Sequence, residues 1–135
     1  MVNRRTMLGS AAAALLFQTL ATAENAPAEV KQVFLRDLPD VSLNNWTVTA
    51  VEVSYPPGGA SKTHRHPGFV LGYVLEGEIR FQVRGKPLTT YRAGEMFYEA
   101  PGSVHAVSAN ASEKKRAKIL AMVFAEKGKP ITMPA

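Results

Sequence analysis

The sequence predicts an all-β domain built as a sandwich or barrel. Short β-rich segments alternate polar with apolar residues, and Gly/Pro turns separate them at intervals of about 8 to 12 residues. No amphipathic helical stretch of convincing length follows residue 23. We therefore expect one all-β domain of about 110 residues, a common size for a single domain.

The expected strands follow one another along the chain. Residues 30–35 alternate well enough to form an edge strand, and the β-rich residues 46–55 end at a proline and glycine run. Each later segment is bounded by a glycine, a proline or a polar loop. The remaining expected strands are residues 69–76, 78–83, 88–91, 96–99, 104–108 and 119–125.

The first 23 residues have the pattern of an export signal. Arg4 and Arg5 precede an Ala- and Leu-rich stretch, and the small residues 21–23 suit a signal peptidase. The paired arginines resemble a twin-arginine signal, although the general secretory route stays open. The apolar stretch is shorter than the roughly 20 residues that a membrane-spanning helix needs. The expected organisation is an export signal over 1–23, a mobile lead-in over 24–29 and a single domain over 30–135.

Composition limits the classes of partner. Removal of Arg4 and Arg5 with the signal would lower the formal net charge from +5 to +3. The dense basic run at residues 114–118 has no interleaved aromatic side chains, so we expect no nucleic-acid partner. The chain has no cysteine, so it forms neither disulfides nor thiolate metal sites. We expect a periplasmic or secreted bacterial protein with no stable membrane span after signal cleavage.

The three histidines of the chain occur in two contexts that suit metal ligation. His64 and His66 would point to the same side of a strand, and His105 follows a Pro-Gly pair on a separate strand. Neutral imidazole suits Zn, Cu, Fe and Ni, and three such ligands leave coordination positions open. The alternative is that all three are ordinary polar residues, because a His-x-His pair alone is unspecific.

Two motifs resemble the conserved motifs of the cupin superfamily and span residues 58–110. The first comprises Gly58, His64, His66 and Gly77, and the second comprises Gly94, Gly102 and His105. The resemblance to small single-domain cupins of the type-2 conserved barrel implies a double-stranded β-helix, or jelly-roll, barrel. It also implies a divalent metal (Fe, Mn, Ni or Zn) at His64, His66 and His105, and a homodimer that pairs through residues 30–35.

One departure from the motifs affects the site. Val70 stands where the first motif usually places a glutamate ligand, so the resemblance leaves three histidines without a carboxylate. Such a site carries one more unit of positive charge, which strengthens the metal as a Lewis acid. Ala100 in place of the usual proline and the shifted Asn110 are tolerable in a loop.

Strand parity gives further expectations. Val70 and Gly72 would face the barrel interior, as would Ser103 and Val107 on the strand of His105. A glycine at 72 would either open space beside the metal or allow a bulge or close strand approach. Glu95 and Glu99 are candidate proton acceptors, although glutamate is more often at the surface. The sequence assigns no catalytic residue.

These observations predict an exported small metal-binding cupin that acts on a small organic molecule. The reaction most compatible with three histidines is oxygenation of a chelating substrate by iron, as in some cupin-like dioxygenases. A lyase or isomerase using manganese, nickel or zinc is an alternative. So are a non-catalytic module that binds a small ligand or a metal, and a stable barrel with an empty site.

Overall fold

The structure is a computed structural model that describes residues 26–135. Contacts divide the chain into a short N-terminal unit that ends at Val30 and a second unit, Lys31–Ala135. In the first unit, residues 26–30 are exposed and have no regular secondary structure. The expected export signal lies outside the described residues, so it and the domain boundaries stay predictions. Within residues 26–135, no helix is long and apolar enough to cross a membrane.

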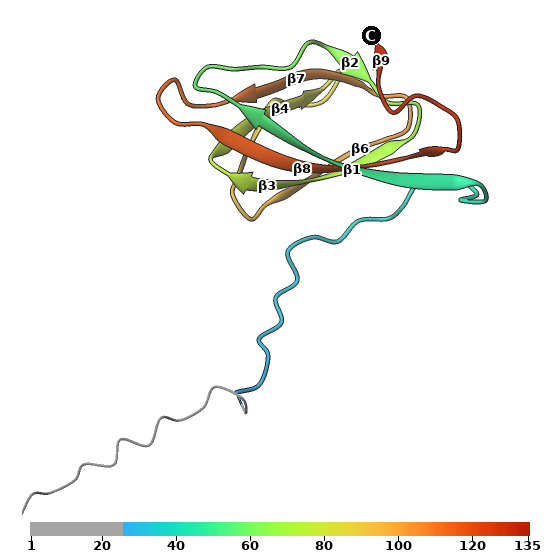
Figure 1. Ribbon diagram of the computed structural model, residues 1–135, viewed down its shortest axis with the longest axis horizontal. Coiled ribbons are helices and arrows are strands. Elements are labelled where there is room, and N and C mark those ends of the chain that lie inside the picture. The colour runs from blue at the N-terminus through green and yellow to red at the C-terminus, as the bar shows by residue number, and fades with distance from the viewer. Residues whose placement is uncertain (1–25) are drawn as a thin grey trace, which may run out of the picture. The chain divides into compact units, whose positions relative to one another are not determined.

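The second unit consists of two antiparallel sheets that form the walls of a barrel (Figure 1). This arrangement confirms the predicted all-β double-stranded β-helix. The four-stranded sheet has the order β1 (Trp46–Tyr55), β8 (Ala117–Glu126), β3 (Phe69–Glu76) and β6 (Met96–Glu99). The five-stranded sheet has the order β5 (Thr89–Arg92), β4 (Glu78–Val83), β7 (Val104–Asn110), β2 (His64–Arg65) and β9 (Met133–Pro134).

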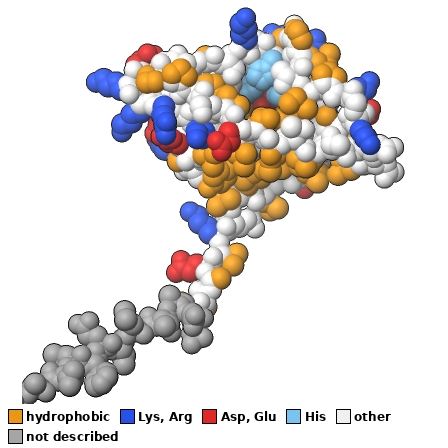
Figure 2. All heavy atoms as spheres, in the orientation of Figure 1, with side chains coloured by type: hydrophobic (Ala, Val, Ile, Leu, Met, Phe, Trp, Pro, Cys, Tyr) orange, Lys and Arg blue, Asp and Glu red, His pale blue; other side chains and the backbone are white. Residues whose placement is uncertain are grey.

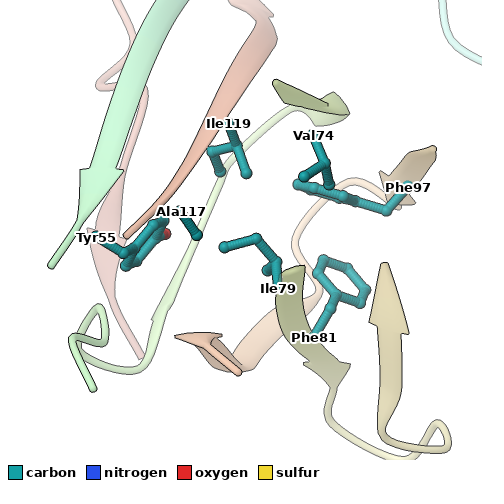
Figure 3. Packing of buried hydrophobic residues seen from close by; sticks show 7 residues of the cluster. All are labelled: Tyr55, Val74, Ile79, Phe81, Phe97, Ala117 and Ile119. Atoms are coloured by element: carbon teal, nitrogen blue, oxygen red, sulfur yellow. The ribbon is translucent and has the colours of Figure 1, made fainter. Parts of the chain in front are cut away.

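Alternation of small or branched apolar residues builds the barrel interior. On β8, every second residue from Ala117 to Ala125 is buried, while the intervening side chains are half-buried. On β4, Ile79 and Phe81 are buried beside exposed charged residues. Each large side chain that is fully buried contributes about 1.5–3 kcal/mol to folding. Figure 3 shows the main core cluster, which consists of Tyr55, Val74, Ile79, Phe81, Phe97, Ala117 and Ile119.

The sequence placed seven strands to within two residues of their observed ends and was wrong about residues 30–35. That segment has no regular secondary structure, and Leu35 is 82% exposed. Alternation alone does not make a strand, because a strand needs a partner edge and a face to bury. The short β9 was not expected, since a proline-containing tail carries no strand signal of its own.

Candidate metal centre

The structure brings the three histidines together at one end of the barrel interior. His64 on β2 is the direct cross-strand partner of His105 on β7, and their ring centroids lie 5.0 Å apart. His66 follows β2, and its ring centroid lies 5.0 Å from that of His64. The ligand atoms of these residues and of Glu99 all lie within 4.8 Å of one another, so the cluster could hold a metal ion.

Glu99 corrects the expectation of a site without a carboxylate. This residue is only 2% exposed, although glutamate is more often at the surface. Its Oε1 lies 3.0 Å from Nδ1 of His105, and its Oε2 lies 3.7 Å from Nε2 of His66. Glu99 is the direct cross-strand partner of Val70, the position where the first motif usually places a glutamate ligand. The carboxylate therefore reaches the site from β6 instead of β3.

A sequence signal for Glu99 existed in the alternation of β6. Phe97 and Glu99 point to the same side and are both buried, while Met96 and Tyr98 are half-buried on the other side. A glutamate that shares a strand face with a core phenylalanine must enter the interior. The charge of Glu99 obscured this reading because glutamate is seldom buried without a partner.

Backbone carbonyls fix the tautomers of two histidines. Nδ1 of His64 lies 2.7 Å from the carbonyl oxygen of Lys62, and Nδ1 of His66 lies against the carbonyl oxygen of Ile131. A carbonyl oxygen only accepts, so each Nδ1 carries the proton and donates it. The Nε2 lone pair of each ring is then free, as in histidines that bind metals.

The buried polar atoms that lack a hydrogen-bond partner also point to a cation. Within residues 26–135 these atoms are Oε2 of Glu99 and both ring nitrogens of His105. His105 Nδ1 and Glu99 Oε1 are close but are not aligned as a hydrogen bond. Unsatisfied buried groups are costly, and all three atoms belong to the same cluster. Three nitrogens and one carboxylate oxygen fit a divalent transition metal.

The protonation of His66 agrees with this donor set. Burial lowers the pKa of His66 below its ordinary value of 6.5, and the neighbouring His64 and His105 act in the same direction. The Ile131 carbonyl and the Glu99 carboxylate oppose this shift without cancelling it. His66 is therefore neutral at pH 7, which is the form that ligates a metal.

A cavity of about 400 Å³ adjoins the cluster. It falls within the usual range of small-molecule sites, roughly 300–1,000 Å³. Figure 2 shows histidine side chains at the bottom of a hollow in the surface. Outside the cluster, the charged residue in the lining is Lys62, and one wall is aliphatic. That wall consists of Val51, Val53, Ile119, Ala121 and Val123.

The inward orientation expected for Val70 and Gly72 on β3 is confirmed, and the structure also shows the role of Gly72. Val70 is 1% exposed and lines the cavity. A Cβ at Gly72 would lie 2.0 Å from Cζ of Phe97, its cross-strand partner. The space over Gly72 is thus filled by the phenyl ring, so this glycine serves close packing and does not open room beside the site.

The parity expectations on β7 are wrong. The pairing with β4 shifts between Gln82 and Val83, which leaves Ala106 as an extra residue on β7. This bulge turns Ser108 inward together with His105, in place of Val107. Ser103 donates its hydroxyl to the carbonyl of Ala100 and does not line the cavity. Sequence patterns do not reveal a single-residue bulge, so the prediction assumed regular alternation through Ala106, where the bulge interrupts it.

Comparison with known proteins agrees with this architecture. Residues 51–123, more than half of the chain, match the model of the cupin domain. A search of curated proteins finds no match.

Three similar solved structures illustrate the fold, and the chain spans less than two thirds of each. The DMSP lyase DddQ from Ruegeria pomeroyi has a TM-score of 0.56 at 19% identity, over 65% of this chain and 43% of the other. A cupin-like protein from Thermotoga maritima has a TM-score of 0.55 at 22% identity, over 65% and 64%. A predicted oxalate decarboxylase from Thermotoga maritima has a TM-score of 0.51 at 28% identity, over 58% and 66%. By its matched domain and its fold, the chain belongs to the cupin family.

Proposed function

We propose that this protein is a metal-dependent cupin enzyme that acts on a small organic molecule in the barrel cavity. The observation that carries the proposal is the convergence of four ligand atoms within 4.8 Å, three of the four residues being buried. The ligands would be His64, His66, Glu99 and His105. A bound divalent cation would supply Lewis acidity at this end of the cavity.

The chain's own residues would set the charge of the site. Glu99 offsets one of the two charges of a divalent cation, and the three imidazoles are neutral ligands. The loaded site would keep one net positive charge, one unit less than a site without the carboxylate. Lys62 adds a second positive charge to the lining of the cavity. These charges support an anionic substrate.

Two reaction classes fit this donor set. Oxygenation was favoured by a site with histidines alone, and the presence of Glu99 removes that argument. Lyase or isomerase chemistry can use the metal as a Lewis acid that stabilises an enolate or alkoxide, and a predicted oxalate decarboxylase is among the similar structures. The metal that co-purifies separates the two classes, because a protein that holds only zinc would argue against oxygenation.

A non-catalytic binding module is the second candidate. Beyond the four proposed ligands, the cavity lining offers few groups for acid–base work, chiefly Tyr55 and Lys62. A binding module would retain its ligand without forming product. Incubation of the metal-loaded protein with a retained ligand, followed by mass spectrometry of the small molecules, distinguishes the two.

Elemental analysis tests the proposed centre. Wild type purified without added metal should hold close to one cation per chain, and the His64→Ala/His66→Ala double variant should hold almost none. Glu52→Gln is the matched control, because Glu52 is exposed and lies outside the cavity lining. Equal metal in wild type and the double variant would rule out these ligands, and a metal-free wild type would favour an empty barrel.

We also propose that the protein forms a homodimer through the outer face of the four-stranded sheet. In an antiparallel sheet with one solvated face, outward residues are usually polar, whereas β3 is apolar on both faces. Figure 2 shows hydrophobic side chains gathered along the lower edge of the domain, where β1, β3 and β8 run in Figure 1. This face is mainly apolar, and the charged residues Glu52 and Lys118 on it pair with each other, so it suits a second copy of itself around a two-fold axis. This outer face consists of Val48, Leu71, Tyr73, Leu75, Met96, Tyr98, Leu120, Met122 and Phe124.

We further propose export to the periplasm or beyond, which rests on the pattern of residues 1–23 alone. A twin-arginine route would suit a protein that folds around a metal before export. Replacement of Arg4 and Arg5 by lysine should then retain the precursor in the cytoplasm. Unchanged export of the variant would remove the support for that route.

A further inference from the structure

Three hydroxyl groups form a cluster in the same cavity as the metal centre. Tyr55 ends β1, Ser61 lies in the loop before β2, and Ser108 lies on β7. The hydroxyl oxygen of Tyr55 is 2.8 Å from Oγ of Ser108 and 3.1 Å from Oγ of Ser61. Tyr55 and Ser108 are each 4% exposed, and Ser61 is half-buried.

A count of hydrogen-bond donors shows that this cluster is incomplete. Three hydroxyls bring three O–H donors, and the two bonds between them use two. The structure gives these hydroxyls no other hydrogen-bond partner among residues 26–135. One O–H therefore stays without an acceptor in every arrangement of the protons. All three residues line the cavity, so the free donor is available to a ligand there.

The surroundings of the cluster define the kind of group that would accept this hydrogen bond. Tyr55 belongs to the main core cluster and packs with apolar residues such as Ile119 and Ala117. No charged side chain takes part in the hydroxyl cluster. A charged group placed here would be buried without a counter-ion, which is unfavourable. A neutral oxygen, such as a hydroxyl or a carbonyl, fits instead.

We propose that Tyr55, Ser61 and Ser108 are a second contact point for the substrate and set its specificity. This inference rests on the proposed function, since the metal centre would hold the other end of the molecule. The substrate class is a small organic anion with a carboxylate toward the metal and Lys62. An aliphatic middle lies against the Val51 and Val53 wall, and a neutral oxygen reaches the hydroxyl cluster.

A purely structural role is the competing explanation. The bond between Tyr55 and Ser108 joins β1 to β7, which belong to different sheets. If the cluster only braced the two sheets, its removal would weaken every ligand equally. If it contacts the substrate, its removal would affect only ligands that carry the neutral oxygen. Paired ligands that differ in one hydroxyl separate these roles.

The test is a calorimetric titration of the protein with straight-chain carboxylates from butanoate to hexanoate and their terminal hydroxy counterparts. Wild type loaded with one Mn²⁺ should bind the best-fitting hydroxy member roughly 2- to 12-fold more tightly than its parent, the equivalent of one net hydrogen bond. The triple variant Tyr55→Phe/Ser61→Ala/Ser108→Ala removes every hydroxyl donor of the cluster, so it should reduce this preference toward one and leave the affinity of the parent unchanged. Tyr91→Phe and Ser54→Ala are matched controls outside the cavity lining and should keep the preference.

The outcomes separate this inference from the proposed function. Equal affinity for both members of every pair in wild type, or an equal loss for both in the triple variant, would overturn the role of the cluster. Titration of the metal-free protein with the same carboxylates tests the metal centre. If Mn²⁺ does not tighten the binding of any carboxylate, the metal centre is contradicted. The preference for the hydroxy member, measured in metal-free protein, still shows whether the hydroxyl cluster contacts the ligand.

Discussion

Val70 and Glu99 face each other across the ladder between β3 and β6. Directly opposed residues in an antiparallel sheet have Cβ atoms about 4.5–5.5 Å apart and point to the same face. A carboxylate on either residue can therefore reach the same part of the interior. The residue that fills the usual ligand position in this chain is apolar, and its neighbour across the ladder supplies the acid.

Glu99→Gln should reduce metal affinity by about 100-fold or more, because it removes the one negative charge among the proposed ligands while keeping the side-chain shape. Orienting partners of ligands alone typically account for about 10- to 100-fold. Competition with a chromophoric chelator measures the affinity. Glu95→Gln is the control, since Glu95 is exposed and lies outside the cavity lining. Wild-type affinity in Glu99→Gln would exclude this carboxylate as a ligand.

The exchange variant Val70→Glu/Glu99→Val tests the relationship itself. The opposed positions share one face, so the relocated carboxylate should recover at least a tenth of the wild-type metal affinity. Val70→Glu alone would place two buried carboxylates together and should lower stability, since like charges disfavour ionisation. If the exchange variant binds no better than Glu99→Val, the equivalence of the two positions is wrong.

Acid should destabilise the metal-free protein through His66. Burial holds the pKa of His66 in the folded state below 6.5, so on acidification the unfolded chain takes up the proton first. The stability that neutral His66 provides is complete above pH 6.5 and is lost as the pH falls toward the folded-state pKa. Urea unfolding of metal-free wild type and of His66→Gln between pH 7.5 and 5 measures this contribution. Parallel pH profiles for the two proteins would contradict it.

The sequence predicted the parts of the fold that depend on local periodicity. Alternation and Gly/Pro turns were enough for β1, β3 and β6, because each buries one regular face. Prediction from the sequence failed where the pairing between strands determines the structure. The bulge at Ala106 changes the inward set on β7, and residues 30–35 find no partner edge. Glu99 shares a buried face with Phe97 on β6, which is a local signal, but its position opposite Val70 depends on the pairing of two strands.

A charge on the outer face of the four-stranded sheet should dissociate the proposed homodimer. Leu71 lies between Met122 and Tyr98 on that face, so Leu71→Arg would bury an unpaired guanidinium at the interface. Sedimentation velocity should show wild type as a dimer and this variant as a monomer. The two proteins should have the same far-ultraviolet circular dichroism spectrum. Thr90→Arg, at an exposed position of the other sheet, should remain a dimer. A monomeric wild type would contradict the proposed interface.

Gly72→Ala should destabilise the barrel because the ring of Phe97 already fills the space over this glycine. A Cβ there would lie within 2.5 Å of three ring carbons, which forces the ring or the strand to move. Overpacking of this kind typically costs about 1–3 kcal/mol. Urea unfolding measures the loss in the free energy of unfolding. Gly85→Ala is not a suitable control, because Gly85 has a positive φ.

Gly72→Ala/Phe97→Leu is the informative companion to that variant. Phe97→Leu alone leaves a cavity and should cost stability by itself. The smaller side chain should also relieve the clash, so the double variant should lose less than the sum of the two single losses. Phe97 lines the cavity and its ring centroid lies 6.5 Å from that of His105. A strictly additive loss would mean that the strand, and not the ring, absorbs the added methyl group.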